Sequence, residues 1–336
     1  MRCDSAPGYV PGNQHSVYQN RVITIGGYTP SIYSFYTIDG NTWIAGGTPT
    51  TLPTKIISFD GYGWLVAMNA SVTNITKDGG VTWVAGGNRT ASGTWVGCYD
   101  PIHNRIIAAE ASSTTSNYTI NGGTTWIAGG ALSSATPVWS SMAYDPISQR
   151  VILISSNGFS VTNYSTDGGI TWSVGGALSY GTFGILVYNP NNQTMVAIIS
   201  VGGASALMAE YSSDGGTTWN TCGYFNSGLT TPAACCYDPL HNRLVLIDSS
   251  TSRKVLYSAT GQGSWSAGGT LPNPDNNRWY NIVFQPTTGI LIVTGSSTND
   301  SYSTYSLDGG ASWSTASKVE TIHRSIGPLP TCTMMP

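Results

Sequence analysis

Charged residues are unusually scarce in this sequence. Its 336 residues include 13 Lys and Arg and 16 Asp and Glu, so that charged residues make up 9% of the chain, against about 25% in an ordinary globular domain. So few cations cannot form the basic surface that follows a phosphate backbone, which excludes nucleic acid as a partner. No apolar run approaches the roughly 18 residues of a membrane span, and we expect no membrane insertion.

Paired cysteines of the C-x-x-C type are also absent, which excludes the common zinc and redox motifs. The six cysteines are scattered along the chain. We therefore predict no metal and no cofactor. Cys3 and Cys332 lie near opposite ends of the chain, and a disulfide between them is a hypothesis for how the ends are held together.

Aromatic and apolar residues are plentiful. Apolar residues form 40% of the chain, with 11 Trp and 19 Tyr, so the chain folds rather than remaining disordered. Internal repetition decides how it folds. A motif of the form S/T-x-D-G-G-x-T-W recurs seven times, with spacings of 40, 43, 46, 47, 46 and 48 residues between its tryptophans, Trp43, Trp83, Trp126, Trp172, Trp219, Trp265 and Trp313.

A second motif keeps phase with the first. It reads Tyr-Asp-Pro followed by Arg, as at 99–105, 144–150 and 237–243. Each repeat therefore predicts a strand, an Asp-Pro turn, a strand, a hydroxyl-rich loop, a strand, an Asp-Gly-Gly turn and a strand with Trp. Repeats of about 45 residues with four strands are typical of propeller blades. We predict an all-β, seven-bladed β-propeller with four antiparallel strands per blade, and blades at about 14–47, 55–87, 94–130, 138–176, 182–223, 232–269 and 279–317.

The first motif resembles the Asp box, or bacterial neuraminidase repeat, of sialidase-like propellers. In that family the box forms the hairpin between the third and fourth strands of a blade. The resemblance implies a structural role for the tryptophans of the motif and for the box residues Asp39, Asp78, Asn121, Asp167, Asp214 and Asp308. Blade 1 is one residue short, and blade 6 has Thr260 in the Asp position.

The two ends of the chain pose the question of ring closure. We expect an N-terminal arm at 1–13, an innermost first strand near 14–19 and a tail at 318–336. This strand order exchanges no strand between the first and last blades. Closure is then predicted to rest on blade packing, on the Cys3–Cys332 disulfide, or on the tail pairing with an edge strand.

The resemblance to sialidases implies an arginine triad, a Tyr and Glu nucleophile pair and an Asp acid. Nine of the 13 Asp are assigned by phase to turns, and the arginines at 105, 150 and 243 follow an Asp by five residues, which indicates ion pairs across those turns. Outside the second motif remain Arg2, Arg89, Arg253, Arg278 and Arg324. His103 and His241 occupy equivalent turn positions. We therefore predict no catalytic residues.

One cluster of charged residues is left over from the repeats. If a ligand site exists, we expect it on the face opposite the boxes, beside Trp279 and Tyr280, at Asp248, Arg253, Lys254, Asp275, Arg278 and Asp300. Scattered solvated loop charges are the alternative interpretation.

Three functions fit these observations. The favoured prediction is a non-catalytic structural or receptor-contacting component of a phage or viral virion, in a larger assembly, with other virion proteins or a host surface glycan or receptor as partner. Low charge and the absence of a signal peptide favour this virion or extracellular location. The alternatives are a sialidase-like glycoside hydrolase and a secreted glycan-binding or adhesin propeller. N-x-S/T sequons at Asn74, Asn88, Asn117 and Asn163 fit the last of these and are also expected by chance.

Overall fold

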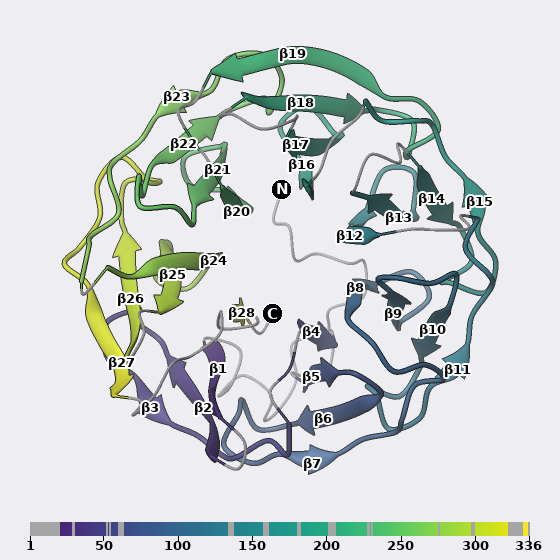
Figure 1. Cartoon of the computed structure of the whole chain (residues 1–336), viewed down its shortest axis with the longest axis horizontal. Coiled ribbons are helices and arrows are strands. Elements are labelled where there is room, and N and C mark those ends of the chain that lie inside the picture. Colours follow the sequence, from purple (N-terminus) through teal and green to yellow (C-terminus); the bar gives the residue numbers. More distant parts are fainter. Residues whose placement is uncertain are drawn as a thin grey trace.

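A ring of seven four-stranded antiparallel sheets makes up the computed structural model of this chain (Figure 1). The structure describes residues 21–28, 31–51, 53, 55–59, 64–133, 138–156, 161–179, 183–200, 206–226, 229, 231–274, 276–296, 300–321 and 332–334. These residues form 28 strands and no helix. The predicted all-β, seven-bladed propeller is confirmed.

The first three blades have short outer strands. Blade 1 contains β1 (Val22–Tyr28), β2 (Ser31–Thr37), β3 (Ile44–Ala45) and β28 (Cys332–Met334). Blade 2 contains β4 (Lys55–Phe59), β5 (Trp64–Asn69), β6 (Val72–Thr76) and β7 (Val84–Ala85). Blade 3 contains β8 (Trp95–Asp100), β9 (Arg105–Glu110), β10 (Ser116–Thr119) and β11 (Ile127–Ala128).

Blades 4 to 7 repeat this order from the innermost to the outermost strand. Blade 4 has β12 (Trp139–Asp145), β13 (Arg150–Ser155), β14 (Thr162–Ser165) and β15 (Ser173–Val174). Blade 5 has β16 (Phe183–Asn189), β17 (Thr194–Ser200), β18 (Ala206–Ser212) and β19 (Asn220–Asn226). Blade 6 has β20 (Pro232–Asp238), β21 (Arg243–Asp248), β22 (Val255–Ser258) and β23 (Ser266–Ala267). Blade 7 has β24 (Arg278–Gln285), β25 (Ile290–Ser296), β26 (Asp300–Ser306) and β27 (Ser317–Thr321).

The C-terminal strand closes the ring. β28 pairs antiparallel with β1, with Val22 opposite Met334 and Thr24 opposite Cys332, and it lies at the inner edge of blade 1 beside β24 and β4 (Figure 1). Blade 1 is therefore built from both ends of the chain.

Two of the predicted means of closure are observed: the tail pairs with an edge strand, and blade 7 packs against blade 1, as in the bond from Trp43 Nε1 to Ser303 Oγ at 2.7 Å. The expectation that the ends of the chain exchange no strand is wrong, because a C-terminal strand completes blade 1. The expected strand at 14–19 and Cys3 lie outside the described residues.

The Asp boxes fold as the resemblance implied. In blade 4, the Ser165 hydroxyl donates to Asp167 Oδ1 at 2.8 Å and accepts from the Gly169 amide at 2.8 Å. Asp167 in turn accepts from the amide and the hydroxyl of Thr171. The glycines after the Asp have φ of 72° and 85°, a left-handed conformation that favours glycine. Asn121 accepts the same amide bond, from Thr125 at 2.9 Å.

In five blades a Gly-Gly pair follows the Trp, and there the blade meets the next one through backbone alone. The Gly87 amide of blade 2 donates to the Gly123 carbonyl of blade 3 at 2.8 Å, and Gly130 donates to Gly169 in the same way at 3.1 Å. A Cβ added at Gly86 would lie 2.6 Å from the Gly123 carbonyl oxygen. Glycine is therefore needed here for close approach of two backbones.

Arginines of the second motif also join neighbouring blades. Arg105 donates to the Asp167 carbonyl of the next blade at 2.9 Å, and its guanidinium carbon lies 4.6 Å from the ring centre of Tyr118. The same arrangement is found for the arginines at 21, 150 and 243 with the box carbonyls of Asp78, Asp214 and Asp308. The predicted ion pairs with the preceding Asp are wrong for the arginines at 105, 150 and 243. Within the described residues the ion pairs are instead those of His103, His241 and Lys318.

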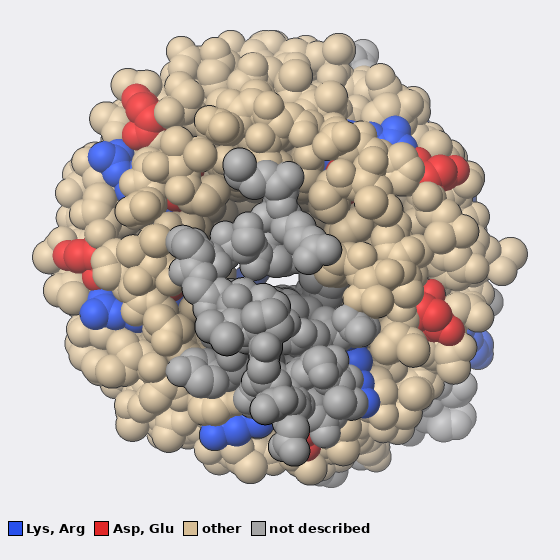
Figure 2. Space-filling model, turned by 180° about the vertical axis from the view of Figure 1, so that it is seen from behind, with Lys and Arg blue, Asp and Glu red and all other residues tan. Residues whose placement is uncertain are grey.

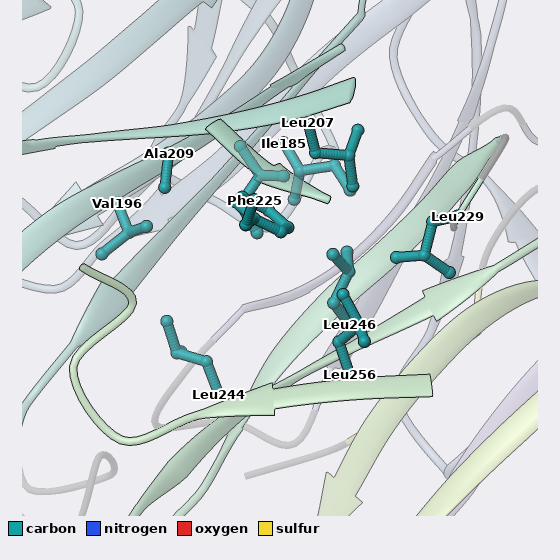
Figure 3. Packing of buried hydrophobic residues seen from close by; sticks show 10 residues of the cluster. Ile185, Val196, Leu207, Ala209, Phe225, Leu229, Leu244, Leu246 and Leu256 are labelled. Atoms are coloured by element: carbon teal, nitrogen blue, oxygen red, sulfur yellow. The ribbon is translucent and has the colours of Figure 1, made fainter. Parts of the chain in front are cut away.

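Hydrophobic side chains fill the space between the sheets. Figure 3 shows the largest of these clusters, in which residues of blade 5 pack against residues of blade 6: Ile185, Val196, Ile198, Leu207, Ala209, Leu244, Leu246 and Leu256. All are less than 9% exposed. The strand faces bury this apolar surface between blades, which explains why the repeats fold only as neighbours in a ring.

Removal of β28 is expected to destabilise the propeller. A chain ending at Thr331 leaves the inner edge of β1 without its partner strand. We expect a loss of about 2–3 kcal/mol in the free energy of unfolding, since each backbone hydrogen bond contributes about 1 kcal/mol, measured by urea denaturation. A chain ending at Met334 keeps the strand and is the control. Equal stability of the two truncated chains would show that β28 does not close the ring.

Candidate functional site

The propeller has two unlike faces. The Asp boxes and the Asp-Pro turns lie at the same ends of the strands, and we call this the turn face. The loops between second and third strands and the connections between blades lie at the other ends, and we call this the loop face. A space-filling view shows few charged side chains, spread around the ring with no continuous basic area on the face in view (Figure 2).

The carboxylates of the turn face accept hydrogen bonds within their own turns. Partial burial raises the pKa of the box residues, but hydrogen bonds from the turn outweigh it, so the pKa lies below its ordinary value at Asp39, Asp78, Asp167, Asp214 and Asp308. In the Asp-Pro turns, Asp100 and Asp238 accept from His103 and His241 Nδ1 at 2.8 and 2.7 Å. Ser148 makes the equivalent bond to Asp145 in blade 4. Because a Ser replaces the His there, these histidines act as turn residues.

Two glutamates on inner parts of the blades are engaged as well. Glu110 is 7% exposed and accepts from the Ser112 amide, and Glu210 is 1% exposed and accepts from the Ser179 amide at 3.1 Å. Ser179 belongs to the connection between blades 4 and 5. Glu210 therefore anchors that connection to the third strand of blade 5.

Asparagines make the same anchor in three other blades. Their side-chain oxygens accept from the amides of Thr50, Thr90 and Ser133, and they are Asn74, Asn117 and Asn163. Each of these asparagines is at most 1% exposed. Three of the four sequon asparagines named above are thus buried structural residues, which removes these three as support for a glycosylated protein. Asn88 is exposed.

The predicted ligand-site residues separate into two groups. Asp248 is fully buried and accepts from the Thr231 and Ser250 amides and from the hydroxyls of Ser250 and Ser252. Asp300 is 6% exposed and pairs with Lys318 Nζ at 2.7 Å. Both carboxylates hold the fold together. Lys318 was missed from the sequence because nothing in the repeat places β27 opposite Asp300.

The predicted cations Arg253, Lys254 and Arg278 do not hold the fold together as the two carboxylates do. Lys254 and Arg278 are exposed, and Arg253 is partly buried. Arg278 lies close to Tyr280: partial burial raises the pKa of that phenol, and the positive charge of Arg278 lowers it in part. The sixth predicted residue, Asp275, lies outside the described residues.

Asn277 is a residue that the sequence analysis missed. It is the last residue of the connection between β23 and β24, directly before Arg278 and Trp279 of β24, and it is 2% exposed. Neither its side-chain oxygen nor its side-chain nitrogen has a hydrogen-bond partner in the described part of the chain. A buried amide in this state requires an explanation, such as a bound ligand or water.

The other leftover arginines do not complete a triad. Arg89 is 4% exposed, donates to the carbonyls of Asn69, Ala70 and Val72, and lies over Trp95 at 4.9 Å. Burial lowers the pKa of Arg89 to about 10. Its role is structural. Arg2 and Arg324 lie outside the described residues, which leaves Arg253 and Arg278 available.

One basic side chain lies at the inner edge of blade 2. Lys55 is the first residue of β4 and is partly buried. Burial lowers the pKa of the Lys55 amine, and the neighbouring Cys98 partly reverses this. Burial raises the pKa of Cys98 far above its ordinary value, so its thiol is protonated at neutral pH and is not a nucleophile. The same holds for Cys235 and Cys236.

Over the described ranges, no three His, Cys, Asp or Glu side chains are grouped as ligands of one metal ion. The described part of the chain contains no helix long and apolar enough to cross a bilayer.

Comparison with known proteins supports the fold. The BNR/Asp-box repeat family matches residues 164–174, the box of blade 4. A search of curated proteins finds no match. Among solved structures, a Lactobacillus plantarum protein is similar over 93% of this chain and 99% of its own, with 15% identity and a TM-score of 0.67.

Two further similar structures carry names of enzymes. The periplasmic gluconolactonase of Pseudomonas aeruginosa is 11% identical, with a TM-score of 0.66 over 94% of this chain and 99% of its own. A Bacteroides fragilis protein described as a 6-phosphogluconolactonase is 11% identical, with a TM-score of 0.66 over 96% of this chain and 100% of its own. Identities this low show the shared fold alone.

These neighbours correct two expectations from the sequence. The prediction of a non-catalytic phage or viral virion component is wrong, because the structural neighbours include lactonase propellers. The prediction that the chain is not an enzyme is contradicted by the same neighbours, which carry the names of lactone hydrolases. The Asp-box propeller itself is supported, and the sialidase-like assignment is not confirmed.

The Asp boxes are expected to make stability depend on pH. Their pKa values are lowered on folding, so the stability they contribute is present above the unfolded Asp pKa of about 3.9 and is lost as the pH falls through the folded values. The double variant Asp167→Asn, Asp214→Asn keeps the turn geometry of Asn121 but no longer titrates. We expect it to unfold less steeply with acid, as followed by tryptophan fluorescence between pH 7 and 2.

The reverse change at blade 3 is the matched control. Asn121→Asp introduces a titrating group into the same turn and should make acid unfolding steeper. An acid transition that is identical in the wild type and both variants would contradict the role given to these carboxylates.

Proposed function

We propose that this protein is a hydrolase of small sugar-derived lactones, acting on the loop face of the propeller. The observation that carries the proposal is the similarity over almost the full length of both chains to propellers named as gluconolactonases. The loop face is the candidate surface because the turn face is occupied by Asp-box and Asp-Pro hydrogen bonds that repeat from blade to blade.

The chemistry of the described residues agrees better with a lactone than with a glycoside. Glycoside hydrolysis generally needs two carboxyl groups about 5–10 Å apart, and Glu110, Glu210, Asp248 and Asp300 are each held by protein donors. A lactone is a cyclic ester. Its opening needs one attack of water on a carbonyl, aided by a base and by positive charge near the developing oxyanion. We therefore do not extend the resemblance to sialidases to sialidase activity.

Lys55 is the residue that we assign as general base. Burial lowers the pKa of its amine, which is the direction that a general base requires. It stands at the loop-face end of the inner strand of blade 2, beside the closing strand β28. A water molecule activated there would attack the lactone carbonyl, and the ring oxygen would leave as the hydroxyl of the open-chain acid.

Hydrolysis of glucono-1,5-lactone and its 6-phosphate tests the proposal. The acid released is measured with a pH indicator and corrected for spontaneous opening of the lactone. We expect acceleration by the wild type, and a fall in kcat of about 100-fold in Lys55→Met, the loss typical of a missing general base. Lys77→Met, which changes a lysine of the turn face, should retain full activity.

Two results would overturn the proposal. One is a wild-type rate equal to the spontaneous rate on both lactones. The other is binding of an oligosaccharide without turnover of any lactone, which would make the protein a glycan-binding propeller.

A further inference from the structure

We infer that the loop face of blades 6 and 7 holds an anion-binding site, formed by Arg253, Asn277 and Arg278, for the carboxylate or phosphate of a small polyhydroxylated acid. This inference rests on the proposed function, since it identifies the charged end of the substrate or product. It concerns binding, and a binding experiment can test it without turnover.

The backbone brings the site residues to one side of the molecule. The loop between β21 and β22 carries Arg253, the connection between β23 and β24 ends at Asn277, and Arg278 is the first residue of β24. The Leu271 amide in this connection donates to the Arg253 carbonyl at 2.9 Å. The Trp279 indole donates to the Pro272 carbonyl at 3.1 Å and holds the end of the connection against its beginning.

Among the described residues of this part of the surface, the charge that remains unused is positive. The nearby carboxylates of Asp248 and Asp300 are occupied, the first by amides and hydroxyls and the second by Lys318. By contrast, the guanidinium groups of Arg253 and Arg278 make no ion pair and no hydrogen bond within the described residues. Exposed Lys254 adds a third cation. Arginine is well suited to carboxylate and phosphate because its donors match two acceptor oxygens.

These two arginines differ from the arginines that join the blades. The guanidinium groups of Arg105 and Arg150 bind box carbonyls of the next blade and lie over Tyr118 and Tyr164. Arg253 and Arg278 do neither. Their role is thus not explained by the repeat.

Asn277 supplies the second, independent observation. Its amide group is 98% buried, with a donor and an acceptor that are both unpartnered within the described ranges. Sugar hydroxyls both donate and accept, so they can satisfy a side-chain amide at its two ends. An anionic group on the arginines and a hydroxyl on Asn277 together describe a sugar acid.

The backbone of the same two segments is also unusual. Arg253 and Asn276 have φ of 50° and 56°, a left-handed conformation that is strained for residues other than glycine. Four other non-glycine residues with positive φ, at 104, 149, 193 and 242, share one position of the Asp-Pro turn. Asn276 follows no such repeat, whereas Arg253 shares with Ala70 a position two residues before the third strand of its blade. Strain of this kind persists where the surroundings impose it, and it is common at ligand sites.

Calorimetric titration of the full chain with 6-phosphogluconate, gluconate and inorganic phosphate tests the site. We expect wild-type binding of at least one of these anions, and no binding of neutral glucose. Binding of phosphate and 6-phosphogluconate, but not gluconate, assigns the site to phosphate, and binding of gluconate assigns it to carboxylate. Affinity should fall as salt is raised, because the interaction is electrostatic.

Variants locate the binding. Arg253→Gln and Arg278→Gln should each weaken binding by about tenfold or more, the usual effect of a lost charge-assisted hydrogen bond. Asn277→Ala should weaken binding of the sugar acids more than that of inorganic phosphate. Lys77→Gln removes a cation from the turn face and should leave all affinities unchanged. Circular dichroism and thermal unfolding establish that each variant is folded.

The outcomes separate this inference from the proposed function. Anion binding that depends on the two arginines, without lactone hydrolysis, supports the site and overturns the lactonase proposal. Lactone hydrolysis that is unaffected by Arg253→Gln and Arg278→Gln supports the lactonase and overturns the site. Absence of binding for every anion in the wild type, or equal binding in Lys77→Gln, Arg253→Gln and Arg278→Gln, also overturns the site.

Discussion

The bond between the Gly-Gly backbone of one blade and the box carbonyl of the next is the interaction on which the rest of this propeller depends. At Gly87 and Gly123 it brings two backbones together at 2.8 Å, and no side chain fits between them. The Asp box must therefore present its carbonyls in a fixed direction. The side chains of Ser165, Asp167 and Thr171 do this in blade 4, by satisfying the turn from within. Low charge is a consequence, since hydroxyls and amides make most of these bonds.

The repeat could be predicted from the sequence because each turn carries its own chemistry. Asp or Asn accepts amides at short range, and glycine adopts positive φ, so the motif specifies a local structure wherever it occurs. The partners across the blade interface could not be predicted in this way. Arg105 follows Asp100 by five residues and suggested an ion pair, but His103 already binds that carboxylate, and Arg105 reaches Asp167 in the next blade. Closure was equally hidden, because β28 has no repeat motif and its partner β1 lies more than 300 residues earlier in the chain.

The candidate site was predicted in part for the same physical reason. The cluster at blades 6 and 7 could be predicted because its charged residues remain once those at recurring positions of the repeat are set aside. Their availability did not, because it depends on neighbours that the sequence does not place. The hydroxyls of Ser250 and Ser252 donate hydrogen bonds to Asp248, and Lys318 forms an ion pair with Asp300. Among the described residues, what remains is a set of cations with a buried amide, whereas the composition suggested a mixture of both signs.

A scaffold this regular restricts where function can lie. Positions that recur in all blades are needed for packing, so that a change at any of them alters an interface between sheets. The Asp-Pro turns show this, since positive φ recurs there at Asn104, Gln149, Gln193 and Asn242, and Gly289 has it in blade 7. Departures from the repeat are free of this constraint. In the described residues the connection with Asn276 and Asn277 departs from it in conformation and in unpartnered polar groups, and the loop with Arg253 departs from it in charge. Their strain is stabilised by the blades beneath them, through bonds such as that from Leu271 to Arg253. A rigid ring can hold such a segment ready for a ligand, which reduces the ordering that binding would otherwise require.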